Sequence, residues 1–157
     1  MNKAIDGASV RFPPPLIYVA GLAIGVGAEH LLYLPSLGFP IVIRSVAGGL
    51  LDVIGFLVMF AGAGLFLRQR TAILPFKPAR SLVTSGILGW TRNPMYLGMA
   101  LFYVGLAVIL NSLAALVLLP LVLAIVQKQV IAREEAYLER AFGQEYVAYK
   151  NRVRRWL

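Results

Sequence analysis

The sequence contains no cysteine, and its one histidine is His30. The lack of cysteine excludes disulfide bonds, thiolate catalysis and cysteine zinc sites. One histidine without a cluster of acidic residues does not form a metal site, so we expect no metal centre. Acidic residues are also scarce, with 7 Asp and Glu against 15 Lys and Arg, which gives a net charge of +8. Enzyme classes that depend on thiols or on cysteine-bound zinc are therefore excluded.

Hydrophobic residues make up 59% of the 157 residues. This composition is too apolar for a soluble domain, and the chain is too short for two domains of ordinary size. A helix needs about 20 apolar residues to cross a bilayer, and the candidate spans are Leu16 to Leu34, Val46 to Leu67, Met95 to Leu110 and Leu113 to Val130. We expect an all-α, polytopic membrane protein with about four transmembrane helices and a single domain over residues 1–157. The last two spans are short, and hydropathy leaves open whether they cross completely.

The basic residues predict the orientation of these spans. Lys and Arg are concentrated before the first span, between the second and third, and after the fourth, whereas the other loops contain only Arg44. By the positive-inside rule both termini and the central loop are cytoplasmic, and we expect a prokaryotic cytoplasmic membrane. The same residues attract anionic lipid headgroups, so membrane lipids rather than nucleic acid are the expected partners.

The connecting segments contain most of the prolines. Basic residues precede the first apolar run, as in a signal peptide, but Pro13 to Pro15 and the absence of an A-x-A-like site argue against cleavage. We expect Met1 to Pro15 to be a cytoplasmic leader with extended prolines, followed by a retained helix. Pro75 and Pro78 interrupt the segment from Arg68 to Ser85, which predicts an irregular loop.

Small residues occur within the first two spans. Gly21 and Gly25 lie in the first span, and Gly55, Gly62 and Gly64 lie in the second. Such residues let helices approach closely in lipid, and we expect this packing within one chain rather than between chains.

Three ionisable residues lie in or near the predicted hydrocarbon region: Glu29, His30 and Asp52. An intramembrane ionisable group is a candidate for function by default. All three lie towards the outer interface, so hydrogen bonding there is favoured, and a role in proton or substrate handling is the alternative.

Polar residues stand directly before the third span. Asn93 followed by Pro94 is typical of a helix start, because asparagine is a favoured N-cap and proline suits the first helical position. The alternative is functional. The free N–H groups of Met95 and Tyr96 in the first turn form an anion site, and Arg92 stands beside them to pair with a carboxylate.

Adjacent acidic residues follow the fourth span. Glu134 and Glu135 point about 100° apart on a helix, so both cannot face one ligand equally. Glu134 shares a face with Leu138, whereas Glu135 shares one with Glu139, a like-charge pair typical of a solvated face. We therefore expect Glu134 to be functional and Glu135 to be solvated.

A second amphipathic helix is predicted after a stop at Phe142 and Gly143. Tyr146, Tyr149 and Val153 recur at helical spacing beyond this stop. Their aromatic face lies either on the membrane or over a site, and the spacing does not decide between these positions.

The order and spacing of four motifs carry a resemblance to a known family. They are L-V-T-S-G from Leu82, R-N-P-x-Y-x-G from Arg92, E-E-x-x-L from Glu134 and F-G-x-x-Y-x-x-Y from Phe142. This arrangement resembles the isoprenylcysteine carboxyl methyltransferase family, integral membrane enzymes that use S-adenosylmethionine and are related to bacterial phospholipid and thiol methyltransferases. The resemblance covers about the C-terminal half and places the catalytic motifs within residues 80–157.

The resemblance also implies site residues. The catalytic candidates are Glu134 and Arg92. The residues implied to bind S-adenosylmethionine are Arg80, Ser81, Leu82, Val83, Leu88, Asn93, Pro94, Met95, Tyr96 and Glu134. Asn93 stands where many relatives have histidine, and Leu88 stands where eukaryotic members have an aromatic residue. Val130 replaces an arginine that those members use at the substrate, which argues against a prenylcysteine carboxylate as the acceptor here.

The expected activity is methyl transfer from S-adenosylmethionine to a lipophilic acceptor at the cytoplasmic face. An isoprenylcysteine-like carboxylate, a thiol and a lipid are the acceptor classes considered. Glu134 serves either as a base or as a partner of the cofactor ammonium group. The alternatives are an NADPH-dependent sterol-type reductase and a non-enzymatic membrane binding protein, and the oligomeric state stays open.

Overall fold

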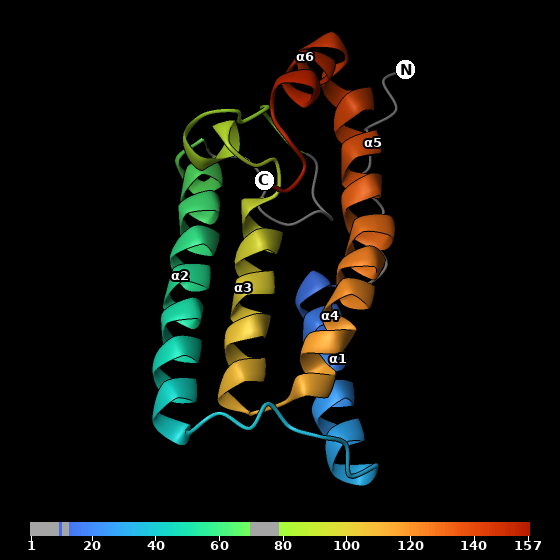
Figure 1. Ribbon diagram of the computed structural model, residues 1–157. Coiled ribbons are helices and arrows are strands. Elements are labelled where there is room, and N and C mark those ends of the chain that lie inside the picture. Colours follow the sequence, from blue (N-terminus) through green and yellow to red (C-terminus); the bar gives the residue numbers. More distant parts are fainter. Residues whose placement is uncertain (1–9, 11–12, 70–78) are drawn as a thin grey trace.

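The computed structural model describes residue 10 and residues 13–69 and 79–157, and these form helices and no strand (Figure 1). The elements are α1 (Pro14–Leu31), α2 (Ile41–Arg68), the short helix η1 (Gly86–Gly89), α3 (Pro94–Ile109), α4 (Leu113–Val126), the π-helical turn η2 (Gln127–Ile131), α5 (Ala132–Phe142) and α6 (Gln144–Arg152). Helices α1 and α3 run in one direction, and α2 and α4 run in the other (Figure 1).

Within the described residues, three helices are long and apolar enough to cross a membrane: Pro14–Leu31, Ile41–Arg68 and Leu113–Phe142. Helix α3 is apolar but has 16 residues, fewer than the roughly 20 that span the hydrocarbon core. Large apolar side chains such as Val19 of α1 and Leu57 of α2 are exposed, each at 63%, as expected for surfaces that contact lipid. The prediction of an all-α polytopic membrane protein is confirmed.

The predicted end of the fourth membrane helix, at Val130, was wrong. The chain does not leave the helix at Val130, because α4, η2 and α5 form one continuous helix from Leu113 to Phe142. The predicted stop at Gly143 is confirmed, and this glycine has a φ of +53°. That left-handed conformation suits glycine, which has no Cβ to clash. Helix α6 then begins at Gln144.

The prediction of extended prolines was wrong for Pro14 and Pro15, although Pro13 is extended, with φ −57° and ψ 125°. Helix α1 begins at Pro14, so Pro14 and Pro15 lie in its first turn. Proline is tolerated there because the N–H groups of a first turn have no partner within the helix. Most of the predicted leader, and the centre of the predicted irregular loop at residues 70–78, lie outside the described residues.

Glycines set the contact between α2 and α3. Gly48 of α2 lies against the carbonyl of Gly105, and Gly55 lies against that of Gly98. A Cβ atom on Gly55 would lie 2.7 Å from the Gly98 carbonyl oxygen. The two backbones therefore touch, which anchors the short helix α3 along the longer α2.

Helices α1 and α4 pack in the same way. Gly21 lies against Val122, and Gly25 lies against the backbone of Ala115. The prediction that the glycines mediate packing within one chain is confirmed for both helix pairs. Gly64 takes no part, because a Cβ there would meet nothing within 4 Å among the described residues.

The tight connection between α3 and α4 lies between the third and fourth predicted spans. Asn111 has a positive φ of 62°, and the Ser112 hydroxyl accepts a hydrogen bond from the Ala115 N–H. Glu29 of α1 accepts hydrogen bonds from the Ser112 hydroxyl at 2.9 Å and from the Ala114 N–H at 3.1 Å. Glu29 therefore makes hydrogen bonds, which is the role that the sequence favoured for it.

The other two intramembrane ionisable residues differ from Glu29. His30 is exposed. Asp52 lies against Gly105, and its buried Oδ1 has no hydrogen-bond partner among the described residues.

Candidate functional site

The motif residues gather at the end of the bundle where α3 begins and where α5 and α6 lie (Figure 1). Tyr96 lies in the first turn of α3, and its hydroxyl donates a 2.6 Å hydrogen bond to Oε1 of Glu134 on α5. The Tyr18 hydroxyl of α1 donates to the backbone oxygen of Tyr96 at 3.0 Å. Three helices therefore fix the position of the Glu134 carboxylate.

Glu135 lies between two arginines. Its Oε1 is 3.0 Å from NH2 of Arg92, and its Oε2 is 2.6 Å from NH2 of Arg155. Nε of Arg155 also donates to Oε1 at 3.0 Å. The side chains of Arg92 and Glu135 are 8% and 10% exposed, so this ion pair is nearly removed from solvent.

The prediction of a solvated Glu135 was therefore wrong. The like-charge argument considered Glu139 on the same helix and not the cations that other segments bring to Glu135. Glu139 itself is exposed and pairs with Lys150. The π-helical turn η2 ends at Ile131, and its wider winding changes the direction in which the following residues point. As a result Glu134 and Glu135 both contact the segment that starts α3.

Asn93 lies at the predicted N-cap position of α3, but its side chain does not make the predicted capping hydrogen bond. It is the N-cap residue of α3 and is followed by Pro94, yet its side chain accepts no hydrogen bond from the first turn. Its Nδ2 instead donates to the backbone oxygen of Arg155 at 2.9 Å. The N–H groups of Met95 and Tyr96 are thus left without an asparagine cap.

The first cofactor-binding candidates lie against the C-terminal helices. Leu82 packs on the cluster formed by Tyr146, Tyr149 and Val153. Val83 and Leu88 are buried. Arg80 is exposed. The aromatic face of α6 therefore packs over this segment, which is one of the two positions that its sequence pattern allowed.

One hydrogen bond ties η1 to α6. The Tyr149 hydroxyl donates to the backbone oxygen of Leu88 at 2.7 Å. Burial raises the pKa of this hydroxyl to about 12. The positive charges of the nearby Arg92 and Arg152 lower the pKa, but by less than burial raises it. The hydroxyl is therefore neutral near pH 7 and acts as a donor.

Several buried polar atoms at the site have no hydrogen-bond partner among the described residues. They include Nε and NH1 of Arg92 and Oγ of Ser81. Buried polar groups are nearly always paired, so these atoms are candidates for contacts with a bound ligand or with water. A guanidinium with two unpaired nitrogens suits a carboxylate or a phosphate. Within the described ranges no group of three or more His, Asp and Glu residues could hold a metal ion.

The chain was compared with known proteins. The model of the phospholipid methyltransferase family matches residues 43–145. The chain belongs to this family. The match includes nearly all of α2, then α3, α4, α5 and the whole segment from Arg80 to Glu135, so the resemblance to membrane methyltransferases is confirmed. The protein is a methyltransferase, and membership in this family argues against the reductase and non-enzymatic alternatives.

Individual relatives match parts of the chain. An uncharacterized protein of Haemophilus influenzae is 52% identical over 64 residues, which are 40% of this chain and all of that protein. The protein-S-isoprenylcysteine O-methyltransferases of Schizosaccharomyces pombe and Saccharomyces cerevisiae are each 38% identical over 72 residues. Those matches cover 46% of this chain and 30% of each yeast enzyme. No solved structure matches the chain.

The sequence pattern did not identify three residues of the candidate site. Arg155 and Tyr18 were not considered as parts of the site, and Glu135 was assigned to the surface. Arg155 is one of several basic residues near the C-terminus, and nothing in the pattern distinguishes it from Arg154. Tyr18 did carry a signal, since it is a hydroxyl-bearing residue within an apolar helix.

We expect Glu135→Gln to destabilise the protein strongly. The substitution leaves the buried Arg92 without a counter-ion, and breaking a buried ion pair costs about 3–5 kcal/mol. Glu139→Gln is the control on the same helix. Its partner Lys150 and Glu139 itself are 38% and 45% exposed, and such surface pairs contribute about 0–1 kcal/mol. Thermal unfolding in detergent micelles measures both, and equal shifts would contradict the buried network.

Proposed function

We propose that the chain transfers a methyl group from S-adenosylmethionine to a lipophilic acceptor at the cytoplasmic face of the membrane. Membership in a methyltransferase family supports methyl transfer. The observation that carries the choice of donor is the buried guanidinium of Arg92, whose Nε and NH1 have no partner in the described part of the chain. S-adenosylmethionine bears a carboxylate that fits such donors.

The residues at the start of α3 suit the amino-acid end of this donor. Arg92 faces its carboxylate, and the N–H groups of Met95 and Tyr96 lie at a helix N-terminus, which favours negative charge. Asn93 does not cap these groups. Arg80, Ser81, Leu82, Val83 and Leu88 are assigned to the remainder of the donor, and Ser81 contributes a buried hydroxyl that has no partner within the described ranges.

S-adenosylmethionine supplies, when bound, a methyl group on a positively charged sulfur. The protein then has to orient the acceptor and exclude water, which together account for much of the rate enhancement in such reactions. The aromatic face of α6 over residues 82–88 and the buried first turn of α3 serve to exclude water at this end of the bundle.

Glu134 is the catalytic candidate next to the acceptor. Its carboxylate is oriented by the Tyr96 hydroxyl at 2.6 Å. With a thiol or amine acceptor, Glu134 takes the proton that the acceptor loses when its bond to the methyl carbon forms. With a carboxylate acceptor no base is required, because that group is already ionised near pH 7. Glu134 then has the alternative role of holding the donor ammonium group.

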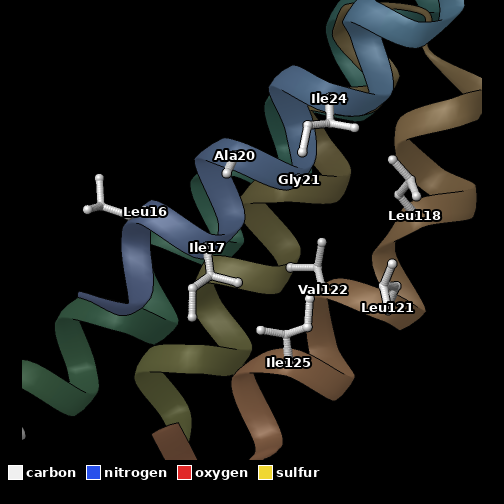
Figure 2. A pocket seen from close by; sticks show the side chains of 9 residues that line it. All are labelled: Leu16, Ile17, Ala20, Gly21, Ile24, Leu118, Leu121, Val122 and Ile125. Carbon is white, nitrogen blue, oxygen red and sulfur yellow. The ribbon is translucent and has the colours of Figure 1, made fainter. Parts of the chain in front are cut away.

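An apolar groove supports a lipophilic acceptor. It has a volume of about 400 Å³ and lies between α1 and α4. Figure 2 shows its lining side chains, Leu16, Ile17, Ala20, Gly21 and Ile24 of α1 and Leu118, Leu121, Val122 and Ile125 of α4. Ile17 precedes Tyr18, which bonds to Tyr96 and so connects this end of the groove with Glu134. We assign the groove to the hydrocarbon part of the acceptor.

The proposed membrane is the prokaryotic cytoplasmic membrane, with both chain termini in the cytoplasm. Helices α1 and α2 run in opposite directions, as do α3 and α4, which brings the start of α1 and the end of α6 towards one end of the bundle (Figure 1). The positive-inside rule then makes this basic end cytoplasmic. The bacterial relative supports the prokaryotic assignment. The site residues of 80–157 and Tyr18 of α1 fit a single domain over residues 1–157.

We expect Glu134→Gln to lower the rate of methyl transfer by about a hundredfold or more, as loss of a general base does. Radiolabelled S-adenosylmethionine, purified protein and a membrane lipid extract provide the assay. If Glu134 acts as a base, the rate at saturation falls and donor binding is kept. If it holds the ammonium group, donor KM rises instead.

Glu145→Gln, at an exposed position of α6, is the matched control and should keep full activity. Full activity of Glu134→Gln would contradict its role. A wild-type protein that labels no lipid but oxidises NADPH would contradict the proposed function.

We expect Ala20→Phe to raise KM for the lipid acceptor without changing KM for the donor. The ring fills the groove that Ala20 lines. Displacing about two methylene groups of the acceptor costs about 1.6 kcal/mol, or about fifteenfold in KM. Ala23→Phe is the control, because Ala23 is exposed on the same helix outside the groove. Equal effects of the two substitutions on KM would contradict the assignment of this groove to the acceptor.

A further inference from the structure

Glu135 is not shared equally by its two arginines. Arg155 contacts both carboxylate oxygens, at 3.0 Å from Nε and 2.6 Å from NH2. Arg92 reaches Oε1 alone, through NH2 at 3.0 Å. Two parallel hydrogen bonds from one guanidinium form the stronger arrangement. Arg155 is therefore the principal partner of Glu135, and Arg92 is the secondary one.

The more deeply buried arginine is the one with fewer contacts. The side chain of Arg92 is 8% exposed and that of Arg155 is 35% exposed. Nε and NH1 of Arg92 have no hydrogen-bond partner in the part of the chain that the structure describes. A buried cation is expected to be fully paired. An additional anion at Arg92 would supply the missing contacts.

The charges at this position leave room for that anion. Arg92 and Arg155 contribute two positive charges, and Glu135 contributes one negative charge, so these three groups, counted without the neighbouring Glu134 carboxylate, have an excess of one positive charge. Without Arg155, Arg92 and Glu135 would neutralise each other. The excess charge at Arg92 thus depends on Arg155.

Backbone contacts hold Arg155 in place beside the start of α3. The Thr91 hydroxyl and Nδ2 of Asn93 both donate to the backbone oxygen of Arg155, at 3.3 and 2.9 Å. The Arg92 N–H donates to the backbone oxygen of Arg154 at 3.0 Å. These contacts use main-chain oxygens, so they persist when the side chains of Arg154 and Arg155 are changed.

We propose that Arg155 is a positioning residue for the methyl donor, because it holds Glu135 and thereby keeps Arg92 available for the donor carboxylate. This inference rests on the proposed use of S-adenosylmethionine. When the carboxylate binds, Arg92 exchanges its single contact with Glu135 for the ligand, and Arg155 keeps Glu135 neutralised. Arg155 itself touches neither the donor nor the acceptor.

Two ligands separate this role from a structural one. S-adenosylhomocysteine has the carboxylate, whereas 5′-methylthioadenosine has the same nucleoside and sulfur without the amino-acid end. We expect Arg155→Gln to weaken S-adenosylhomocysteine binding about tenfold, the usual effect of losing a charged contact. The affinity for 5′-methylthioadenosine should change less than about twofold, because this ligand has no carboxylate to pair with Arg92. Isothermal titration calorimetry in detergent measures both affinities.

Arg154→Gln is the matched control, since it removes the same charge from an exposed neighbour. It should leave both affinities unchanged. Arg155→Lys keeps the charge but loses the two-pronged contact, so we expect a smaller loss that is again confined to S-adenosylhomocysteine. If Arg155→Gln does not fold, this lysine variant decides the question by the same comparison.

The outcomes distinguish the inference from the proposed function. A wild-type protein that does not bind S-adenosylhomocysteine contradicts the proposed function. A wild-type protein that binds it, with equal losses for both ligands in Arg155→Gln and Arg155→Lys, contradicts only the role of Arg155. Selective loss for the carboxylate-bearing ligand supports the role.

Discussion

A carboxylate held between two arginines connects the segments that we propose to carry the chemistry of this protein. Glu135 lies on the helix that continues from α4, Arg92 precedes α3, and Arg155 follows α6. The ion pair of Arg92 with Glu135 is costly to break because both charges have largely lost their hydration. The arrangement of α3, α5 and the C-terminal segment therefore depends on this interaction, and so does the position of Arg92.

The membrane helices make that interaction possible. Glycine contacts let the short α3 lie against α2, and similar contacts bring α1 against α4. The first turn of α3 and the continuing helix of α4 then reach the same end of the bundle, where Tyr96 meets Glu134. In the proposed function, a site built in this way has the aqueous side at one end and hydrocarbon along its length, and methyl transfer to a lipophilic acceptor requires access to both phases.

Much of the fold could be predicted because lipid imposes simple requirements on sequence. Apolar length located the helices, and Gly143 marked a helix end. The burial of Glu135 could not be predicted from a helical wheel, because its partners Arg92 and Arg155 lie 43 and 20 residues away in sequence and a π-helical turn precedes it. The contact of Tyr18 with Tyr96, 78 residues apart, is likewise set by tertiary packing.

The most direct test is an experimental structure of the protein with S-adenosylhomocysteine bound. We expect the ligand carboxylate to lie within hydrogen-bonding distance of the Arg92 guanidinium, while Glu135 stays paired with Arg155. A ligand carboxylate held elsewhere, with Arg92 still bound to Glu135, would contradict the assignment of this network to the methyl donor.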